Sequence, residues 1–305
     1  MPTSRKPTIA RAAGAVACAC AFALAVAGPA SAQTTDASPS ATAPAKGVRV
    51  LEAKVTPRRA YYYGLKPIRF SVTVAAGAPT DLRIDIVRKK SGALERSLFL
   101  DKVAPQTASS VTWDGLSGSG TAVRGKLRFV VKGANGAKLP YSKRFLRAAS
   151  TGKKGRKKGK TRDSFGYFDY IFPVRAKHGY GDGIGAPRGD HTHQGQDISA
   201  PCGTKLVAAQ GGNVKVNAFQ AGGAGYYVVI TTIGGIDHVY MHLIGAPALT
   251  VGQTVLTGQA IGQVGNTGSS SGCHLHYEMW SAPGWFAGGS LVDPTPSLRA
   301  WDKYS

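Results

Sequence analysis

Short runs in which apolar and polar residues alternate recur along most of the chain. Residues 70–74 and 82–86 carry an apolar side chain at every second position, which is the pattern of a strand with one buried face. Turn signals such as Asn135-Gly136 separate the runs in the first half. From Phe165 onward, glycine-rich turns separate strand signals and no amphipathic helix is indicated. The pattern therefore predicts an all-β chain.

Changes in composition divide the chain into five segments. We expect a signal peptide over 1–32, a disordered leader over 33–47, a β-sandwich accessory domain over 48–148, a basic linker over 149–163 and a second all-β domain over 164–305. The sandwich is indicated by about seven short strand signals within about 100 residues. The linker holds seven Lys or Arg and no large apolar residue, so it cannot form part of a core.

The first 32 residues have the three parts of a secretory signal peptide. Three basic residues precede position 12, an uncharged apolar stretch covers 12–27, and Ala30-Ser31-Ala32 form a cleavage signal. The apolar stretch has 16 residues, fewer than the ~20 that span a bilayer. We therefore expect a secreted protein, extracellular or associated with the cell wall.

The formal net charge of +22 lies almost entirely upstream of residue 164. Residues 33–148 carry a net +14 and the linker +6, whereas 164–305 hold seven basic and eight acidic residues, a net −1. A strongly basic region attracts anionic partners. Outside the cell we expect these to be anionic wall polymers or a membrane surface that contacts residues 48–163, and we expect no nucleic acid.

One segment of the accessory domain resembles a known module. Val111-Thr112-Trp113-Asp114-Gly115, followed by several glycines and a strand over 127–131, is similar to the immunoglobulin-like module of flagellar hook-cap proteins. A Trp that ends a strand can bury its ring between two sheets while Asp-Gly turns the chain. The resemblance implies an immunoglobulin-like sandwich. We expect no catalytic role here, because His, Cys and carboxylate residues do not cluster in this segment.

All seven histidines lie between 178 and 276, and four of them fall in three short segments. The segments are His193-Gln194-Gly195-Gln196-Asp197, Tyr240-Met241-His242-Leu243 and His274-Leu275-His276. In a strand, His274, His276 and Glu278 share one face, and Tyr240 shares a face with His242. Four histidines and one aspartate on such faces can converge on a metal ion. Zinc suits this set, because a catalytic zinc takes three N or O ligands and leaves a fourth position for water.

In this order the three segments resemble the signature of the lysostaphin-type (LytM-like) zinc metallopeptidases, secreted enzymes that cut the peptides of bacterial peptidoglycan. The resemblance implies an antiparallel β-sheet domain with a groove. It also implies one Zn²⁺ per domain, held by His193, Asp197 and His276. His274 would act as the general base, and His242 would help to bind or stabilise the tetrahedral oxyanion.

The function implied by the resemblance is that of a secreted zinc metalloendopeptidase, which hydrolyses stem or cross-bridge peptides of peptidoglycan through a metal-activated water. Two alternatives stay open: a non-catalytic cell-wall-binding regulator of other hydrolases, and a bacteriolytic toxin acting on competitors. Regulators of this kind lose the metal ligands. This sequence keeps all of them, which favours an enzyme.

Two cysteines remain after the signal peptide, Cys202 and Cys273. An even number of cysteines in an oxidising compartment permits a disulfide. Strand alternation directs Cys273 away from the face that carries His274 and His276. We therefore expect a Cys202–Cys273 disulfide behind the active-site sheet, closing a loop of about 70 residues and stabilising the fold by ~4 kcal/mol.

Overall fold

The computed structural model describes residues 47–142, 163–189 and 191–305. The expected signal peptide, nearly all of the leader and nearly all of the linker lie outside these residues. The described chain consists of strands and a single helix, α2 (Thr295–Asp302). This helix is too short to cross a membrane. The all-β class is thus confirmed for the described residues, with one short helix added to it.

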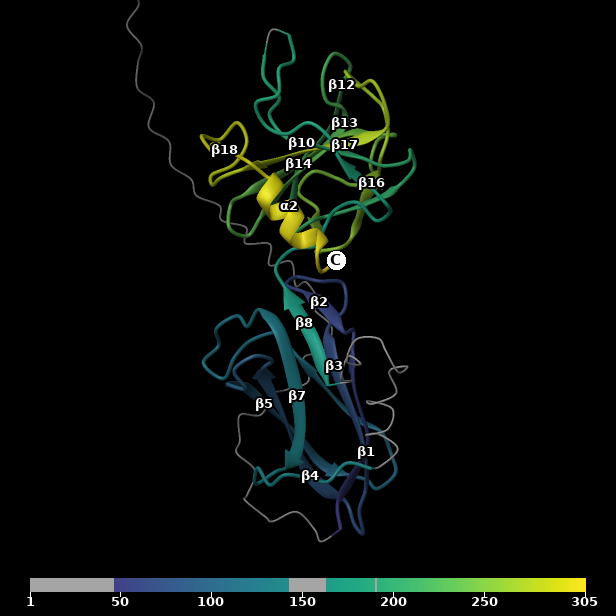
Figure 1. The fold of residues 1–305 in the computed structure, drawn as a ribbon, viewed down its shortest axis with the longest axis vertical. Coiled ribbons are helices and arrows are strands. Elements are labelled where there is room, and N and C mark those ends of the chain that lie inside the picture. The colour runs from purple at the N-terminus through teal and green to yellow at the C-terminus, as the bar shows by residue number, and fades with distance from the viewer. Residues whose placement is uncertain (1–46, 143–162, 190) are drawn as a thin grey trace, which may run out of the picture. The chain divides into compact units, whose positions relative to one another are not determined.

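Two sheets in the N-terminal part surround one apolar core (Figure 1). The smaller sheet has the order β1 (Arg49–Thr56), β3 (Ile68–Ala75), β6 (Ser109–Trp113), and the larger has the order β2 (Arg59–Tyr61), β8 (Ser164–Phe168), β7 (Gly125–Gly133), β4 (Thr80–Arg88), β5 (Leu94–Val103). The ring of Phe70 lies edge-on to Phe129 and Phe165, with centroids 5.2 and 5.5 Å apart. The likeness to the immunoglobulin-like module stays a prediction.

The chain turns directly after β6, as the sequence Trp113-Asp114-Gly115 predicts. Trp113 is buried, and its indole N–H donates to the carbonyl of Leu116 at 2.8 Å. The Asp114 carboxylate accepts the backbone N–H of Leu116 at 2.9 Å, and Gly115 has a φ of 87°. A side chain at Gly115 would overlap the ring of Tyr167, so this turn requires glycine.

Strand β8 belongs to the larger N-terminal sheet, although its residues were expected in the second domain. It pairs parallel with β2 and antiparallel with β7. Phe165 and Tyr167 point into the N-terminal core and are buried there. The N-terminal sheet therefore ends after β8, one strand later than the boundary expected at residue 164.

The C-terminal part is built on one antiparallel sheet (Figure 1). Its order is β15 (Thr254–Val255), β12 (Gly212–Gln220), β13 (Gly225–Thr232), β14 (Asp237–Leu243), β17 (His274–Trp280), β10 (Gln196–Ser199), β9 (Gly179–Tyr180), and β18 (Leu291–Val292) also pairs with β17. A separate pair consists of β11 (Lys205–Val207) and β16 (Ala260–Gln263).

One face of this sheet is the C-terminal core. Tyr240 of β14 and Tyr277 of β17 lie opposite each other and are fully buried, with ring centroids 5.2 Å apart. Helix α2 contributes Leu298 and Trp301 to the same core, and the Trp301 ring stacks on Tyr170 at 4.6 Å. With its aromatic side chains on the core face, the sheet leaves its other face for polar groups.

Candidate metal centre

Three side chains from two neighbouring strands and the preceding loop meet on the other face of the sheet. Asp197 of β10 lies directly opposite His276 of β17, and His193 precedes β10. Asp197 Oδ1 is 3.0 Å from His193 Nε2 and 3.0 Å from His276 Nδ1. The two ring nitrogens are 2.8 Å apart. The structure therefore brings together the three residues expected to bind the metal.

The outer nitrogens of both rings face groups that only accept hydrogen bonds. His193 Nδ1 lies 2.9 Å from the carbonyl oxygen of Gly183, and His276 Nε2 lies 3.0 Å from Glu278 Oε1. Both outer nitrogens therefore carry hydrogen, so neutral rings present lone pairs to each other and to Asp197. Lone pairs at these distances repel unless a cation lies among them. The donor set of two imidazoles and a carboxylate suits a divalent metal.

In the metal-free protein a proton supplies this positive charge. Burial opposes a charged His276, but its hydrogen bonds to Asp197 and Glu278 outweigh burial and raise its pKa to about 8. Burial would likewise raise the pKa of Asp197. The hydrogen bonds from His193 and His276 outweigh this and hold the Asp197 pKa well below its usual range. The cluster thus favours an ionised Asp197 carboxylate with a protonated His276 beside it.

Two further histidines, His242 and His274, lie beside the three ligands. Their ring centroids are 4.7 Å apart, and His274 Nε2 is 3.6 Å from Asp197 Oδ1. His242 Nδ1 donates to the carbonyl of Thr267, and His274 Nδ1 donates to the carbonyl of Gly272, both at 2.8 Å. Each ring therefore keeps a free lone pair on Nε2. Burial lowers the pKa of His242 to about 4, so this ring is neutral at neutral pH.

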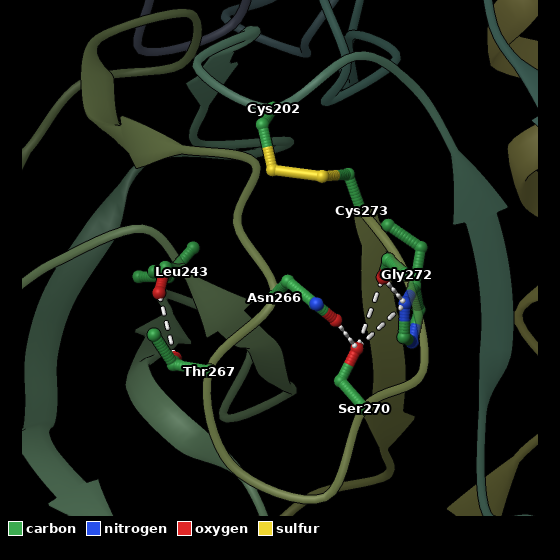
Figure 2. Close-up of a disulfide and its surroundings, with 8 residues drawn as sticks. Cys202, Leu243, Asn266, Thr267, Ser270, Gly272 and Cys273 are labelled. Carbon is green, nitrogen blue, oxygen red and sulfur yellow. Dashed lines mark hydrogen bonds between the residues drawn. A yellow bond between two sulfur atoms is a disulfide. The ribbon is translucent and has the colours of Figure 1, made fainter.

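Both carbonyls belong to one loop between β16 and β17 (Figure 2). The Ser270 hydroxyl lies 2.6 Å from Asn266 Oδ1 and 3.0 Å from the Gly272 carbonyl, and the Thr267 hydroxyl donates to Leu243 at 2.7 Å. A disulfide joins Cys273, the residue before His274, to Cys202, as Figure 2 shows. The expected cysteine pair is therefore present, and it lies at the end of the loop that orients both histidines.

The ligand histidines and His274 line one cavity, which we call the groove. His242 reaches it only because strand alternation stops at its position. Its φ is 60°, in the left-handed region, which costs a residue other than glycine ~1–2 kcal/mol. Tyr240 points into the core, whereas His242 lines the groove. The expectation that Tyr240 and His242 share a face is wrong. The backbone N–H of His242 donates to Ala224 at 2.8 Å, which helps to hold this conformation.

Sequence reasoning missed Arg188, whose guanidinium lies 2.7 Å from Asp197 Oδ2 and 3.3 Å from Asp182 Oδ2. Arg188 lies in a loop, where no periodic pattern indicates which side chains meet. Of the other histidines, His238 is buried in the core, and His178 lies 3.3 Å from Asp302 of α2. His191 lines the groove without joining the ligand cluster.

Comparison with known proteins agrees with this geometry. Residues 191–294 match the sequence model of peptidase family M23. An uncharacterized metalloprotease of Haemophilus influenzae is 46% identical over 87 residues, which is 28% of this chain and 18% of that protein. An L-Ala–D-Glu endopeptidase of Bacillus subtilis is 32% identical over 160 residues, which is 46% of this chain and 47% of that protein.

Among solved structures, the catalytic domain of lysostaphin from Staphylococcus simulans is 30% identical and is matched with a TM-score of 0.37, over 40% of this chain and 92% of that one. The chain spans less than half the length of the first curated relatives it matches. The C-terminal region carries a peptidase domain of family M23, so the expected relationship of this region to a metallopeptidase family is confirmed.

Proposed function

We propose that the M23 domain of this chain is a zinc endopeptidase that hydrolyses peptide bonds of bacterial peptidoglycan. The observation that carries the proposal is the convergence of three metal-ligand atoms beside two imidazoles whose Nε2 lone pairs are free. Relatives are named as an L-Ala–D-Glu endopeptidase of Bacillus subtilis and a peptidoglycan DD-endopeptidase of Vibrio cholerae. The second name gives peptidoglycan as the substrate, and the first gives a peptide bond to a D-amino acid.

The metal would be held by His193 Nε2, Asp197 Oδ1 and His276 Nδ1. When bound, zinc polarises a carbonyl and lowers the pKa of an attacking water. The outer hydrogen bonds of the two ligand histidines hold each ring in the tautomer that presents a lone pair inward. Glu278 adds negative charge behind His276, which strengthens that ring as a ligand.

His274 is the side chain best placed to move the proton. Its Nδ1–H is engaged by Gly272, so Nε2 accepts the proton of the attacking water and then donates it to the departing amine. His242 also begins as an acceptor, through Nε2, and burial disfavours its protonation. Because His274 is more exposed than His242, we assign the transient positive charge to His274. We assign the orientation of the water to His242 in place of the expected stabilisation of the oxyanion, which would need a hydrogen on Nε2.

The accessory region would hold the enzyme at the wall. Residues 33–148 carry a net +14, against −1 for 164–305, so we infer that phosphate-bearing wall polymers or a membrane surface contact residues 48–163. Such contacts weaken with salt. Binding to purified walls should therefore decrease at high salt and on removal of wall phosphate polymers. Undiminished binding under both conditions would argue against this role. We also propose secretion, from the signal-peptide pattern in the first 32 residues.

Replacement of a ligand tests the catalytic proposal. His276→Ala should lose both bound zinc and the release of soluble fragments from purified peptidoglycan, because one of the three ligand atoms is gone. His178→Ala is the matched control, since His178 lies against α2 away from the ligand cluster. Fragment release by zinc-free His276→Ala would contradict the proposed function.

A further inference from the structure

Aromatic side chains form one wall of the groove that contains the metal ligands. We call Tyr227, Trp285 and Phe286 the aromatic wall; these residues and Phe219 line the same cavity as His276. The Trp285 and Phe286 ring centroids are 4.3 Å apart, and Tyr227 stands edge-on to Trp285 at 6.0 Å. Phe286 is 88% exposed and Phe219 53% exposed. Exposed apolar rings gathered in a cavity indicate a ligand-binding surface.

The buried carboxylate of Asp237 holds the backbone of Trp285 in place through hydrogen bonds. Asp237 has no solvent exposure and accepts hydrogen bonds from Lys215 Nζ at 2.7 Å, Thr231 Oγ1 at 2.6 Å and the Trp285 N–H at 2.8 Å. Lys215 Nζ also donates to the Trp285 carbonyl at 2.6 Å. A side chain at Gly284 would approach Asp237 to 2.5 Å, so the loop lies directly on this carboxylate.

The Asp237 cluster fixes a loop that presents an exposed aromatic ring. Burying the Asp237 carboxylate carries a desolvation penalty, which its hydrogen bonds from Thr231, Trp285 and the partly exposed Lys215 offset. Phe286 has a φ of 52°, which costs ~1–2 kcal/mol, and its ring remains in solvent. Strain and exposed apolar surface that persist together mark positions kept for binding.

The distribution of charge indicates what the wall binds. None of its three side chains is charged, and Asp237 and Lys215 beneath it neutralise each other. Among the described residues, two charged lining groups besides the ligand Asp197 come from the loop before β10, on the opposite side of the ligands in the sheet order: Asp182 and Arg188. The remaining one, Glu278, is buried against the His276 ring. The groove thus has a charged end, which suits a peptide with ionised groups, and an uncharged aromatic end.

We propose that the aromatic wall binds a neutral acetamido sugar ring of the glycan strand, while the attached peptide lies at the metal. This proposal rests on peptidoglycan being the substrate. A pyranose ring offers apolar C–H faces that stack on aromatic rings, and its edge carries polar groups. Gln220 lines the same part of the groove and can provide an amide to the acetamido group. Because the wall and the metal ligands share one cavity, sugar and peptide are bound together.

The test is a titration of the zinc-loaded full chain with the tetramer of N-acetylglucosamine, which carries no peptide. Calorimetry and tryptophan fluorescence measure the binding. The wild type should bind saturably. Trp285→Ala should weaken binding roughly tenfold, as expected for the loss of one stacked ring. Phe286→Ala is a second variant with little influence on folding, because its ring is 88% exposed, and it should also weaken binding. Ile233→Ala, at a 62% exposed position outside the cavity lining, should bind as the wild type does.

A ligand variant separates this proposal from the proposed function. His276→Ala should bind the sugar as well as the wild type does, although it cannot cleave peptides. Absence of saturable binding by the wild type, or unchanged binding by both Trp285→Ala and Phe286→Ala, would overturn the sugar site while leaving the endopeptidase proposal intact. If the two variants lost affinity for an uncharged stem peptide but not for the sugar, the wall would be a peptide site and the proposal would be wrong.

Discussion

Replacing Glu278 by glutamine should weaken zinc binding about 10- to 100-fold, or about 1.4–2.7 kcal/mol. Glu278 is buried, and its two oxygens accept from His276 Nε2 at 3.0 Å and from the Trp280 indole N–H at 2.7 Å. Glutamine has one acceptor oxygen for these two donors. The NH2 end of the glutamine must therefore face either the Trp280 N–H or His276 Nε2. In the second case the His276 ring carries its hydrogen on Nδ1 and has no lone pair there for the metal. Competition with a chromophoric chelator measures the dissociation constant.

The double variant Glu278→Gln, Trp280→Phe is the matched control. It removes the indole N–H, so the glutamine oxygen can remain on His276 and part of the lost affinity should return. The recovery separates the hydrogen-bonding effect from the lost negative charge. A dissociation constant for Glu278→Gln within twofold of the wild type would show that Glu278 does not set the tautomer of His276.

Two other predictions concern stability. Replacing Cys202 and Cys273 together by serine should lower the free energy of unfolding by ~4 kcal/mol, because the disulfide closes a sequence separation of 71 residues. In the same variant kcat should fall more than KM rises, because the loop that ends at Cys273 also orients His274. Urea denaturation measures the first effect and peptidoglycan digestion the second; unchanged values would show that the disulfide has neither role. Burial lowers the pKa of His238 to about 4 from an unfolded value of about 6.5, so its neutral form favours the folded state fully above pH 6.5 and this contribution is lost as the pH falls toward 4, by up to ~3 kcal/mol. Denaturation at pH 7 and pH 4.5 should show a smaller pH dependence for His238→Gln, and equal dependence in both proteins would show that His238 does not cause the loss.

Strand periodicity predicted the part of the site that lies on regular strands. In β17, Leu275 and Tyr277 enter the core while His276 and Glu278 face the groove, as alternation requires. Pairing of β10 with β17 then places Asp197 opposite His276. These positions follow from a period of two and from an apolar face that must be buried.

The remaining features depend on tertiary contacts that periodicity does not describe. The left-handed backbone at His242 is stabilised by groups from other strands and loops, so the sequence around it reads as an ordinary strand. Strand β8 is assigned to its sheet by neighbours far away along the chain. Helix α2 has eight residues, two of them buried, which is too short for a clear apolar period.

Mass spectrometry of the fragments released from purified peptidoglycan by the zinc-loaded protein, with and without a zinc chelator, shows whether this domain is a zinc endopeptidase. Hydrolysis of a peptide bond by the His193, Asp197 and His276 centre should give fragments with a new amine terminus and intact glycan bonds, and the chelator should abolish them. Equal release in the presence of the chelator, or fragments produced only by cleavage of glycan bonds, would contradict a zinc-dependent endopeptidase activity.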